Sequence, residues 1–242
     1  MKAIFITGTD TGVGKTIISA SLCAFLSLRK NLDVGVMKPF ESGFSAPGND
    51  ALLPDAAFLK MASGTNDVLD EVNPYVFKAP LSPEAASSLE RVDIDIDKVS
   101  RIFEQLRERH DILVIEGAGG VMVPIRKGFY FADLIKRWDI PVVVVSRLGL
   151  GTINHTLLTN AFLQSMGVPV LGVILNDING DDDIAAKTNP DMLRYYLNTP
   201  VFGIFPHTDI RLTKTETREF LADTFARHID TGAVMRAVGL KT

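Results

Sequence analysis

Six short apolar segments recur along the chain, and longer stretches with apolar residues at helical spacing lie between them. None of the six alternates strictly between apolar and polar residues, which is typical of strands covered on both faces. This alternation of strands and helices predicts an α/β fold with a mainly parallel sheet and helices on both faces. Strands are expected at 3–6, 34–37, 112–115, 142–145, 170–175 and 201–205, and helices at about 15–28, 55–62, 96–109, 131–138, 152–166 and 190–197.

Three further stretches have weaker patterns. Residues 63–95 contain three prolines and are expected to form a long irregular excursion from the sheet. Residues 177–189 include the Asp triplet 181–183 and are expected to be a solvated loop, because such a run more often lies on a soluble surface than binds a metal. Residues 215–230 predict a surface helix. Since no repeat or Ser/Gly-rich linker interrupts the sequence, residues 1–242 are expected to form one domain.

Composition argues against several classes of protein. The 25 Lys and Arg residues stand against 29 Asp and Glu without forming a basic block, so neither nucleic acid nor an anionic membrane is an expected partner. The one cysteine, Cys23, excludes an intrachain disulfide and a paired-cysteine metal site, and fits a cytoplasmic location. The apolar run at 3–6 is too short for a signal peptide. Residues 148–176 lack charge over a membrane-spanning length, but their polar side chains and Gly-Val-Pro break favour a buried helix followed by a strand.

A glycine-rich turn after the first strand carries the strongest chemical signal. Residues 8–16 read Gly-Thr-Asp-Thr-Gly-Val-Gly-Lys-Thr, one residue longer than the usual P-loop spacing, and a helical pattern follows. Glycines allow backbone N–H groups to surround phosphate oxygens, and the helix N-terminus adds partial positive charge. Lys15 is expected to reach the β- and γ-phosphates, and the Thr16 hydroxyl to ligate Mg²⁺. The sequence therefore predicts the fold of a P-loop NTPase, with nucleotide contacts from Gly12, Val13, Gly14, Lys15, Thr16 and Ile17.

An acid and a second lysine follow two other predicted strands. Glu116 comes directly after the strand at 112–115 and precedes a flexible Gly-Ala-Gly-Gly turn, a position from which its carboxylate would face Mg²⁺. A solvent-facing acid at the strand end is the alternative. Lys38 ends the strand at 34–37, and the carboxyl ends of parallel strands line the ligand crevice. A surface lysine is the alternative there.

Two sequence features narrow the class of P-loop protein. The guanine-reading pattern Asn-Lys-x-Asp of small GTPases does not occur, and Asp10 stands where partition-type ATPases carry a signature lysine. A cobyrinate-type synthetase would need a glutaminase nucleophile, but Cys23 lies within the first predicted helix. An ATP-driven switch and a cobyrinate-like synthetase remain as alternatives to the interpretation that follows.

Together these segments resemble the ATP-dependent dethiobiotin synthetase family, and the resemblance extends to about residue 207. Its other matching segments are Asp55-Ala56, Asn73-Pro74-Tyr75, Ser82-Pro83, Phe131-Ala132-Asp133, Leu148-Gly149, Ile153-Asn154-His155 and Asn176-Asp177. The family converts 7,8-diaminononanoate, CO₂ (from bicarbonate) and MgATP to dethiobiotin, ADP and phosphate in biotin synthesis. The resemblance implies this reaction here, and it assigns no function to residues 210–242.

The resemblance also implies roles for individual side chains. Lys15 and Lys38 would stabilise the reacting anions as catalytic residues. The hydroxyls of Thr11 and Ser42 would hold the diamine, and Asp10 would orient an amine or a water molecule. A side-chain amide can pair with adenine through two hydrogen bonds, so Asn176 would read the base, with a turn-capping role as the alternative. Further nucleotide contacts would come from Glu116, Gly117, Ala118, Gly119, Asp177 and Pro206.

The metal ligands and the subunit contact follow from the same resemblance. Mg²⁺ would be held by Thr16, Asp55 and Glu116, with Asp50 as a rival for Asp55. The helix at 152–166 has no charged face and must be covered on more than one side, which suggests a second subunit. The family resemblance implies a homodimer. Residues 149–154, at the start of this helix, would bind the substrate carboxylate of the partner subunit through Gly149, Leu150 and Asn154.

Overall fold

A six-stranded parallel sheet forms the centre of the computed structural model, which describes residues 3–43, 54–180, 183–208 and 216–240. The strand order is β10-β9-β8-β1-β5-β2. The strands are β1 (Ala3–Gly8), β2 (Val34–Met37), β5 (Ile112–Gly120), β8 (Val142–Arg147), β9 (Val170–Asn176) and β10 (Val201–Phe205). Each contains one of the six apolar segments, so the predicted α/β fold with a mainly parallel sheet is confirmed.

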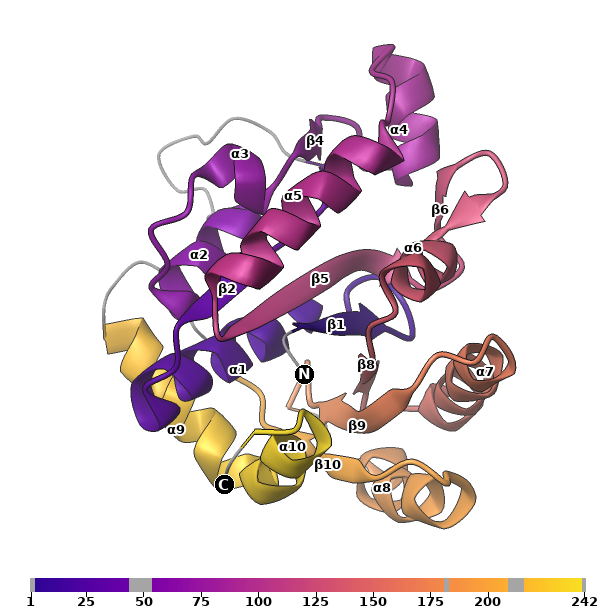
Figure 1. Ribbon diagram of the computed structural model, residues 1–242. Helices are drawn as coiled ribbons and strands as arrows, with labels where there is room; N and C mark the ends of the chain where they lie inside the picture. Colours follow the sequence, from indigo (N-terminus) through magenta and orange to yellow (C-terminus); the bar gives the residue numbers. More distant parts are fainter. Residues whose placement is uncertain (1–2, 44–53, 181–182, 209–215, 241–242) are drawn as a thin grey trace.

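Helices cover both faces of this sheet (Figure 1). One face carries α1 (Lys15–Lys30), α2 (Asp55–Ser63), α9 (Glu216–His228) and α10 (Thr231–Ala237), and the other α5 (Ile96–Arg109), α6 (Phe131–Trp138), α7 (Thr152–Ser165) and α8 (Ile184–Tyr196). Successive residues of β1 enter opposite cores, since Ile4 and Ile6 pack on the α1 side and Phe5 on the α5 side. Burial on both faces explains why the apolar segments do not alternate.

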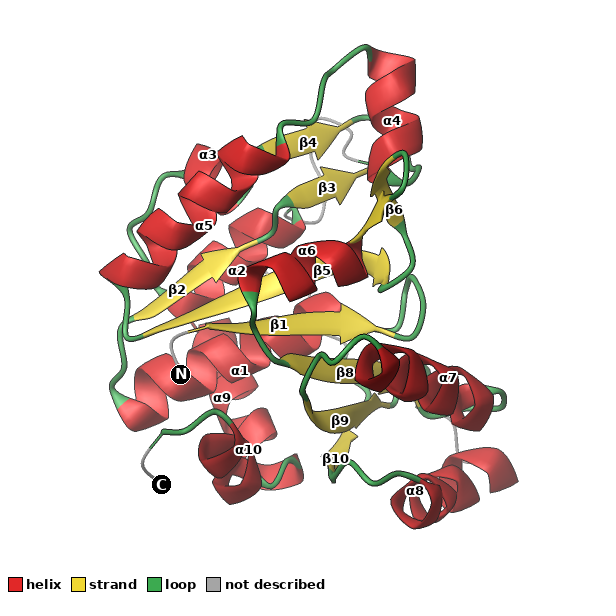
Figure 2. Cartoon of the chain, turned by 45° about the vertical axis from the view of Figure 1, so that its right-hand side comes forward, coloured by secondary structure: helices red, strands yellow, loops and turns green. Residues whose placement is uncertain are grey.

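Two small sheets lie outside the central one. β3 (Phe40–Ser42) pairs in parallel with β4 (Tyr75–Phe77), and β6 (Pro124–Arg126) pairs antiparallel with β7 (Phe129–Tyr130). Figure 2 shows β3, β4 and α4 (Pro83–Glu90) beyond the ends of β2 and β5. Residues 63–95 therefore leave the main sheet as predicted, but they are not irregular, because they also contain α3 (Leu69–Val72). Pro83 starts α4 at its first turn, a position that tolerates proline, and Ser82 caps the helix.

The predicted start of α8 was wrong. The helix begins at Ile184, inside the stretch 177–189 that was expected to be a loop, and Pro190 lies within it. The Asp183 carboxylate caps its N-terminus by accepting a hydrogen bond from the N–H of Ala186 at 2.6 Å. Asp183 therefore has a capping role, and the other two residues of the Asp triplet lie outside the described residues.

The predicted end of β5 was also wrong. The strand continues past the expected boundary to Gly120, which pairs with Gly8 of β1. Glu116 consequently lies inside a strand, and its side chain is fully buried. Because β5 extends over the glycine-rich segment, the predicted end of the strand was wrong. The alternative that Glu116 is a solvent-facing acid was wrong as well.

The predicted surface helix near the C-terminus belongs to the core. α9 packs on α1, with Leu221 and Phe225 fully buried, whereas Phe220 on the same helix is 48% exposed. The rings of Phe225 and Phe25 lie 5.6 Å apart. The charge pattern that predicted a surface helix therefore describes only its outer side.

The uncharged stretch 148–176 folds as the sequence predicts, into α7 followed by β9. Across the described parts of the chain, no helix combines the length and apolar character needed to cross a membrane.

Replacing Phe225 by alanine should destabilise the protein by about 3 kcal/mol, because it opens a cavity between α9 and α1. Phe220→Ala on the same helix is the matched control and should change the free energy of unfolding by less than about 1 kcal/mol. Urea denaturation measures both values. Equal losses would contradict the placement of α9 in the core.

Candidate functional site

The P-loop joins β1 to α1 and requires glycine at its end. Gly14 has a φ of 84°, in the left-handed region, and a Cβ atom there would lie 2.0 Å from Nδ2 of Asn176. Both the backbone conformation and the available space therefore demand glycine. Helix α1 follows directly and has no side-chain cap, so its first N–H groups are suited to an anionic ligand.

Lys15 lies buried beside this loop. Its Nζ donates a hydrogen bond to the backbone oxygen of Asp10 at 3.0 Å. Burial lowers the pKa of Lys15 to about 8, against the opposing effect of the Glu116 carboxylate. A phosphate oxygen beside Nζ would favour the charged form of the lysine, so the site is electrostatically suited to an anion.

Lys38 lies between two carboxylates. Its Nζ donates to Oε1 of Glu116 at 2.6 Å and also to Asp55. Thr16 Oγ1 donates to the same Glu116 oxygen at 2.8 Å. Burial alone would lower the pKa of Lys38, but the two carboxylates outweigh it and hold the pKa above its usual range. The lysine is therefore a fixed positive charge within the site.

The backbone of Lys38 is fixed by the end of α3. Its N–H donates to the carbonyl of Val72 at 2.7 Å, and its carbonyl accepts a hydrogen bond from Nδ2 of Asn73 at 2.6 Å. Lys38 is only 3% exposed, which corrects the alternative of a surface lysine.

The three residues predicted to hold Mg²⁺ are brought together around Lys38. Oε2 of Glu116 is buried and has no hydrogen-bond partner among the described residues. An unpartnered carboxylate oxygen, the Thr16 hydroxyl and the Asp55 carboxylate form an oxygen donor set that fits Mg²⁺, which usually completes its shell with water and phosphate. The described residues contain no cluster of three or more His, Cys, Asp or Glu side chains that could hold a metal. Asp50, the rival ligand, lies outside the described residues.

A cavity of about 710 Å³ opens beside this cluster and collects most of the predicted site residues. Those that line it are Thr11, Gly12, Gly14, Lys15, Thr16, Lys38, Ser42, Asp55, Glu116, Ala118 and Gly119. The predicted site residues that do not line the cavity are Val13, Ile17, Gly117, Asn176, Asp177, Pro206, Gly149, Leu150 and Asn154. All the predicted metal and amine contacts and most of the predicted phosphate contacts thus share one cavity, whereas the predicted base and carboxylate contacts lie apart from it.

Asn176 ends β9 next to the P-loop. Its side chain is buried, and Nδ2 donates to the backbone oxygen of Val13 at 3.0 Å. The N–H of Asp177 donates to the carbonyl of Phe205 at 2.9 Å, directly before Pro206. The two predicted base-contacting segments therefore end adjacent strands, and Asn176 also shapes the P-loop, a role that sequence reasoning missed.

Helix α7 turns polar residues inward. Thr152 and Thr156 are buried, whereas Leu158 is 61% exposed. Ser146 Oγ lies 2.7 Å and 2.8 Å from Oγ1 of these two threonines, and 3.2 Å from Oγ1 of Thr9. Hydroxyl groups thus connect the P-loop with the beginning of α7.

The residues predicted to bind a partner subunit's substrate lie where this helix begins. Leu150 is 85% exposed, and Asn154 is exposed as well. The carbonyl of Gly149 accepts a hydrogen bond from Nδ2 of Asn189 at 3.1 Å, which anchors the turn to α8.

Glu41 lines the cavity and was missed by sequence reasoning. Its carboxylate accepts hydrogen bonds from the N–H groups of Asp55 and Ala56 at 2.8 and 3.2 Å. Burial raises its pKa, opposed by the nearby Lys38 ammonium. Only the pairing of β3 with β4, which the sequence pattern did not reveal, places Glu41 here. The turn before α4 and the first residue of that helix also line the cavity, through Pro80, Leu81, Ser82 and Pro83.

Cys23 lies in the middle of α1 and is fully buried. Burial holds the pKa of its thiol well above the usual range. A protonated, enclosed thiol is a poor nucleophile, which argues against the glutaminase needed by a cobyrinate-type synthetase.

Known proteins support both the sequence family and the fold. A family model described as an AAA domain matches residues 2–213. An ATP-dependent dethiobiotin synthetase from Bacillus licheniformis is 38% identical over 235 residues, covering 97% of this chain and 96% of the relative. One from Thermodesulfovibrio yellowstonii is 45% identical over 217 residues, covering 86% and 90%.

Solved structures show the likeness of fold alone, because their sequence identity is low. A ParA family ATPase from Chlorobium tepidum has a TM-score of 0.54 at 15% identity, covering 99% of this chain and 100% of that one. The MinD cell division protein from Aquifex aeolicus has a TM-score of 0.53 at 18% identity, covering 100% and 99%. Both likenesses support the P-loop NTPase fold.

Replacing Lys38 by methionine should destabilise the nucleotide-free protein, because the buried Glu116 carboxylate loses its neighbouring cation. We expect a loss of roughly 3 kcal/mol in the free energy of unfolding, measured by urea denaturation. Adding Glu116→Gln to the same chain removes the buried charge and should restore most of the loss. A double variant as unstable as Lys38→Met would show that charge compensation is not the cause.

Proposed function

Because the chain belongs to the dethiobiotin synthetase family, we propose that it closes the cyclic urea ring of dethiobiotin from 7,8-diaminononanoate, CO₂ and ATP, releasing ADP and phosphate. One observation carries the proposal beyond the family relationship. The cavity beside the P-loop is lined by two lysines and three acids, Lys15, Lys38, Glu41, Asp55 and Glu116. Residues 1–242 would act as one P-loop ATP-binding domain.

The proposed reaction proceeds through two anionic intermediates. One amine of the substrate takes up CO₂ as a carbamate, and a carbamate oxygen attacks the γ-phosphorus of ATP with release of ADP. The second amine then attacks the carbonyl carbon of this mixed anhydride, which closes the urea ring and expels phosphate. No step requires a nucleophile from the protein.

Positive charge is the main contribution of the chain. The carbamate and the triphosphate are both anions, so their approach needs fixed cationic groups in a cavity shielded from water. Lys38 is held in its charged form by two carboxylates, and Lys15 becomes charged beside a phosphate. Thr11 and Ser42 line the same cavity, and their hydroxyls would hold the diamine.

The oxygen donors of Thr16, Asp55 and Glu116 are the proposed Mg²⁺-binding groups. When bound, Mg²⁺ supplies positive charge to the phosphate oxygens. Lys38, which contacts both carboxylates, offsets part of their negative charge in the nucleotide-free protein.

ATP is proposed to bind along the P-loop, with its phosphates on residues 12–17 and beside residues 116–119. The base would lie toward Asn176, Asp177 and Pro206, at the ends of β9 and β10. A side-chain amide there suits the donor and acceptor edge of adenine. The buried free thiol of Cys23 suits a cytoplasmic location.

A homodimer is proposed through an exposed apolar surface on α7 and α8. Leu158 of α7 and Ile184 and Tyr195 of α8 are 61%, 81% and 79% exposed. Large apolar side chains exposed on two helices that pack together are the basis of this proposal. Such a contact would present residues 149–154, the turn before α7 and its first three residues, to the partner subunit's substrate.

The decisive test incubates the protein with ATP, Mg²⁺, bicarbonate and 7,8-diaminononanoate and detects the cyclic urea by mass spectrometry. Lys15→Ala and Lys38→Ala should each lower kcat by about 10²–10³, the usual cost of losing one group that stabilises the transition state. ATP hydrolysis without the urea product would favour an ATP-driven switch instead. Near-normal turnover of Lys38→Ala would remove that lysine from the mechanism.

A second test addresses the substrate carboxylate. If residues 149–154 bind it through helix N–H groups, the methyl ester of the diamine should have a KM at least about 10-fold higher, because a charge-assisted contact is lost. Methylation leaves both amines and the alkyl chain unchanged, so kcat should change little. Equal KM values for acid and ester would place the carboxylate elsewhere.

A further inference from the structure

Helix α2 begins without a cap from its own sequence. Its N-cap residue is Pro54, which offers no side-chain acceptor to the first N–H groups. Glu41 of β3 fills this role from another element. Its two carboxylate oxygens separately accept from the N–H groups of Asp55 and Ala56, at 2.8 and 3.2 Å. A carboxylate at a helix N-terminus is also favoured by the helix dipole.

The position of Glu41 is itself firmly set. Glu41 pairs with Val76 across the β3–β4 sheet, and the residue is only 7% exposed. The preceding residue, Phe40, stacks on Tyr75 with ring centroids 5.6 Å apart. Glu41 therefore caps α2 from a packed sheet.

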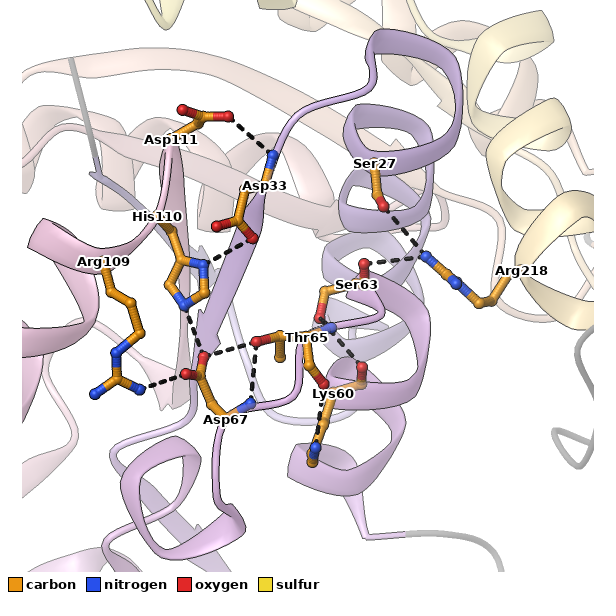
Figure 3. A network of polar contacts seen from close by, with 10 residues as sticks. All are labelled: Ser27, Asp33, Lys60, Ser63, Thr65, Asp67, Arg109, His110, Asp111 and Arg218. Atoms are coloured by element: carbon orange, nitrogen blue, oxygen red, sulfur yellow. Dashed lines mark hydrogen bonds and ion pairs between the residues drawn. The ribbon is translucent and has the colours of Figure 1, made fainter.

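The other end of α2 is held by a cation. Arg218 of α9 donates from Nε to the carbonyl of Ala62 and from its guanidinium NH₂ group to the carbonyl of Ser63, both at 3.0 Å. The same NH₂ group lies 3.2 Å from Ser27 Oγ of α1, and Figure 3 shows Arg218 between these two serines. Positive charge at the C-terminus complements the dipole in the same way.

The chain after α2 is held as well. Asp67 accepts a hydrogen bond from Thr65 Oγ1 at 2.8 Å, and Nε2 of His110 lies 2.8 Å from its carboxylate (Figure 3). Nδ1 of His110 lies 2.9 Å from Asp33 at the start of β2. The C-terminal side of α2 thus has several supports, whereas the capping contacts at its first turn come from Glu41.

Asp55 is the first residue of α2, and its carboxylate contacts Lys38 in the cavity. Aspartate near a helix start readily turns back to accept the free N–H groups of its own first turn. Glu41 already occupies the N–H groups of Asp55 and Ala56, so the Asp55 carboxylate remains available to the cavity.

We propose that Glu41 is a positioning residue, which caps α2 so that the Asp55 carboxylate faces the cavity beside Thr16 and Glu116. The inference rests on the proposed function in one respect, the assignment of Asp55 to Mg²⁺. Glu41 itself touches neither substrate nor metal in this role, and acts through the helix that it caps.

The test variant is Glu41→Gln, which keeps the side-chain length but loses the charge and one acceptor. In the Mg²⁺-free protein, hydrogen exchange at the amides of Asp55 and Ala56 should accelerate while the amides of β3 stay protected. In the presence of ADP, Mn²⁺ binding followed by electron paramagnetic resonance should weaken by about 10-fold, as is typical when a group that orients a metal ligand is lost. The Mg²⁺ concentration for half-maximal activity should rise in parallel, with an unchanged KM for the diamine.

Arg218→Gln is the matched control, because it loosens the same helix at its far end. It should lower the Tm but leave the Mn²⁺ affinity within about 2-fold of the unaltered protein, since Arg218 and Asp55 lie at opposite ends of the helix and distant sites behave independently. An equal loss of Mn²⁺ affinity in both variants would overturn the proposal in favour of a general loosening of α2. Unchanged amide exchange and Mn²⁺ binding in Glu41→Gln would overturn it directly.

Asp55→Asn completes a double-mutant cycle. If Glu41 acts through Asp55, Glu41→Gln should weaken Mn²⁺ binding no further in the Asp55→Asn background. Additive losses would overturn the proposal. The double-mutant cycle is measured by metal binding. The proposed function is judged by whether the unaltered protein makes the cyclic urea. Either proposal can therefore fail without the other.

Discussion

The site depends on a carboxylate that has no access to solvent. Glu116 lies inside β5, and a buried charge of this kind is tolerated only where opposite charge and hydrogen bonds compensate it. Lys38 and Thr16 provide that compensation at 2.6 and 2.8 Å. The same arrangement places a lysine, a hydroxyl and an unpartnered carboxylate oxygen at the wall of the cavity. The requirement for charge balance in the fold and the capacity to bind phosphate and metal therefore come from the same atoms.

The short segment from β2 to β3 organises much of this site. Lys38 follows β2, and Glu41 and Ser42 belong to β3, so one turn of the chain carries the buried cation, the cap of α2 and a hydroxyl of the cavity. Asn73 fixes the Lys38 carbonyl, and Tyr75 stacks on the residue before Glu41. Packing of this segment against β4 thereby couples the orientation of the lysine to that of the helix that bears Asp55.

Local sequence predicted the P-loop and the strands well, because both depend on nearby residues. The turn at 8–16 contains its own glycines, lysine and hydroxyl, and strands buried on both faces are apolar without reference to partners. The errors arose where distant residues decide the structure. Gly120 extends β5 by pairing with Gly8, and β3 exists through its pairing with β4. The role of Glu41 follows from that pairing. Helix α8 begins at Ile184 rather than near Pro190 because the Asp183 side chain caps the helix there.

The position of α9 limits where this polypeptide can be truncated for recombinant expression. The match to the AAA-domain family model ends at residue 213, just before the helix that supplies Phe225 to the core and Arg218 to the end of α2. A recombinant fragment ending at that boundary would expose the apolar side of α1 to water and leave the last carbonyls of α2 without their donor. The folding unit is thus longer than the segment that the family model matches, and expression boundaries chosen from that match alone would yield a poorly soluble product.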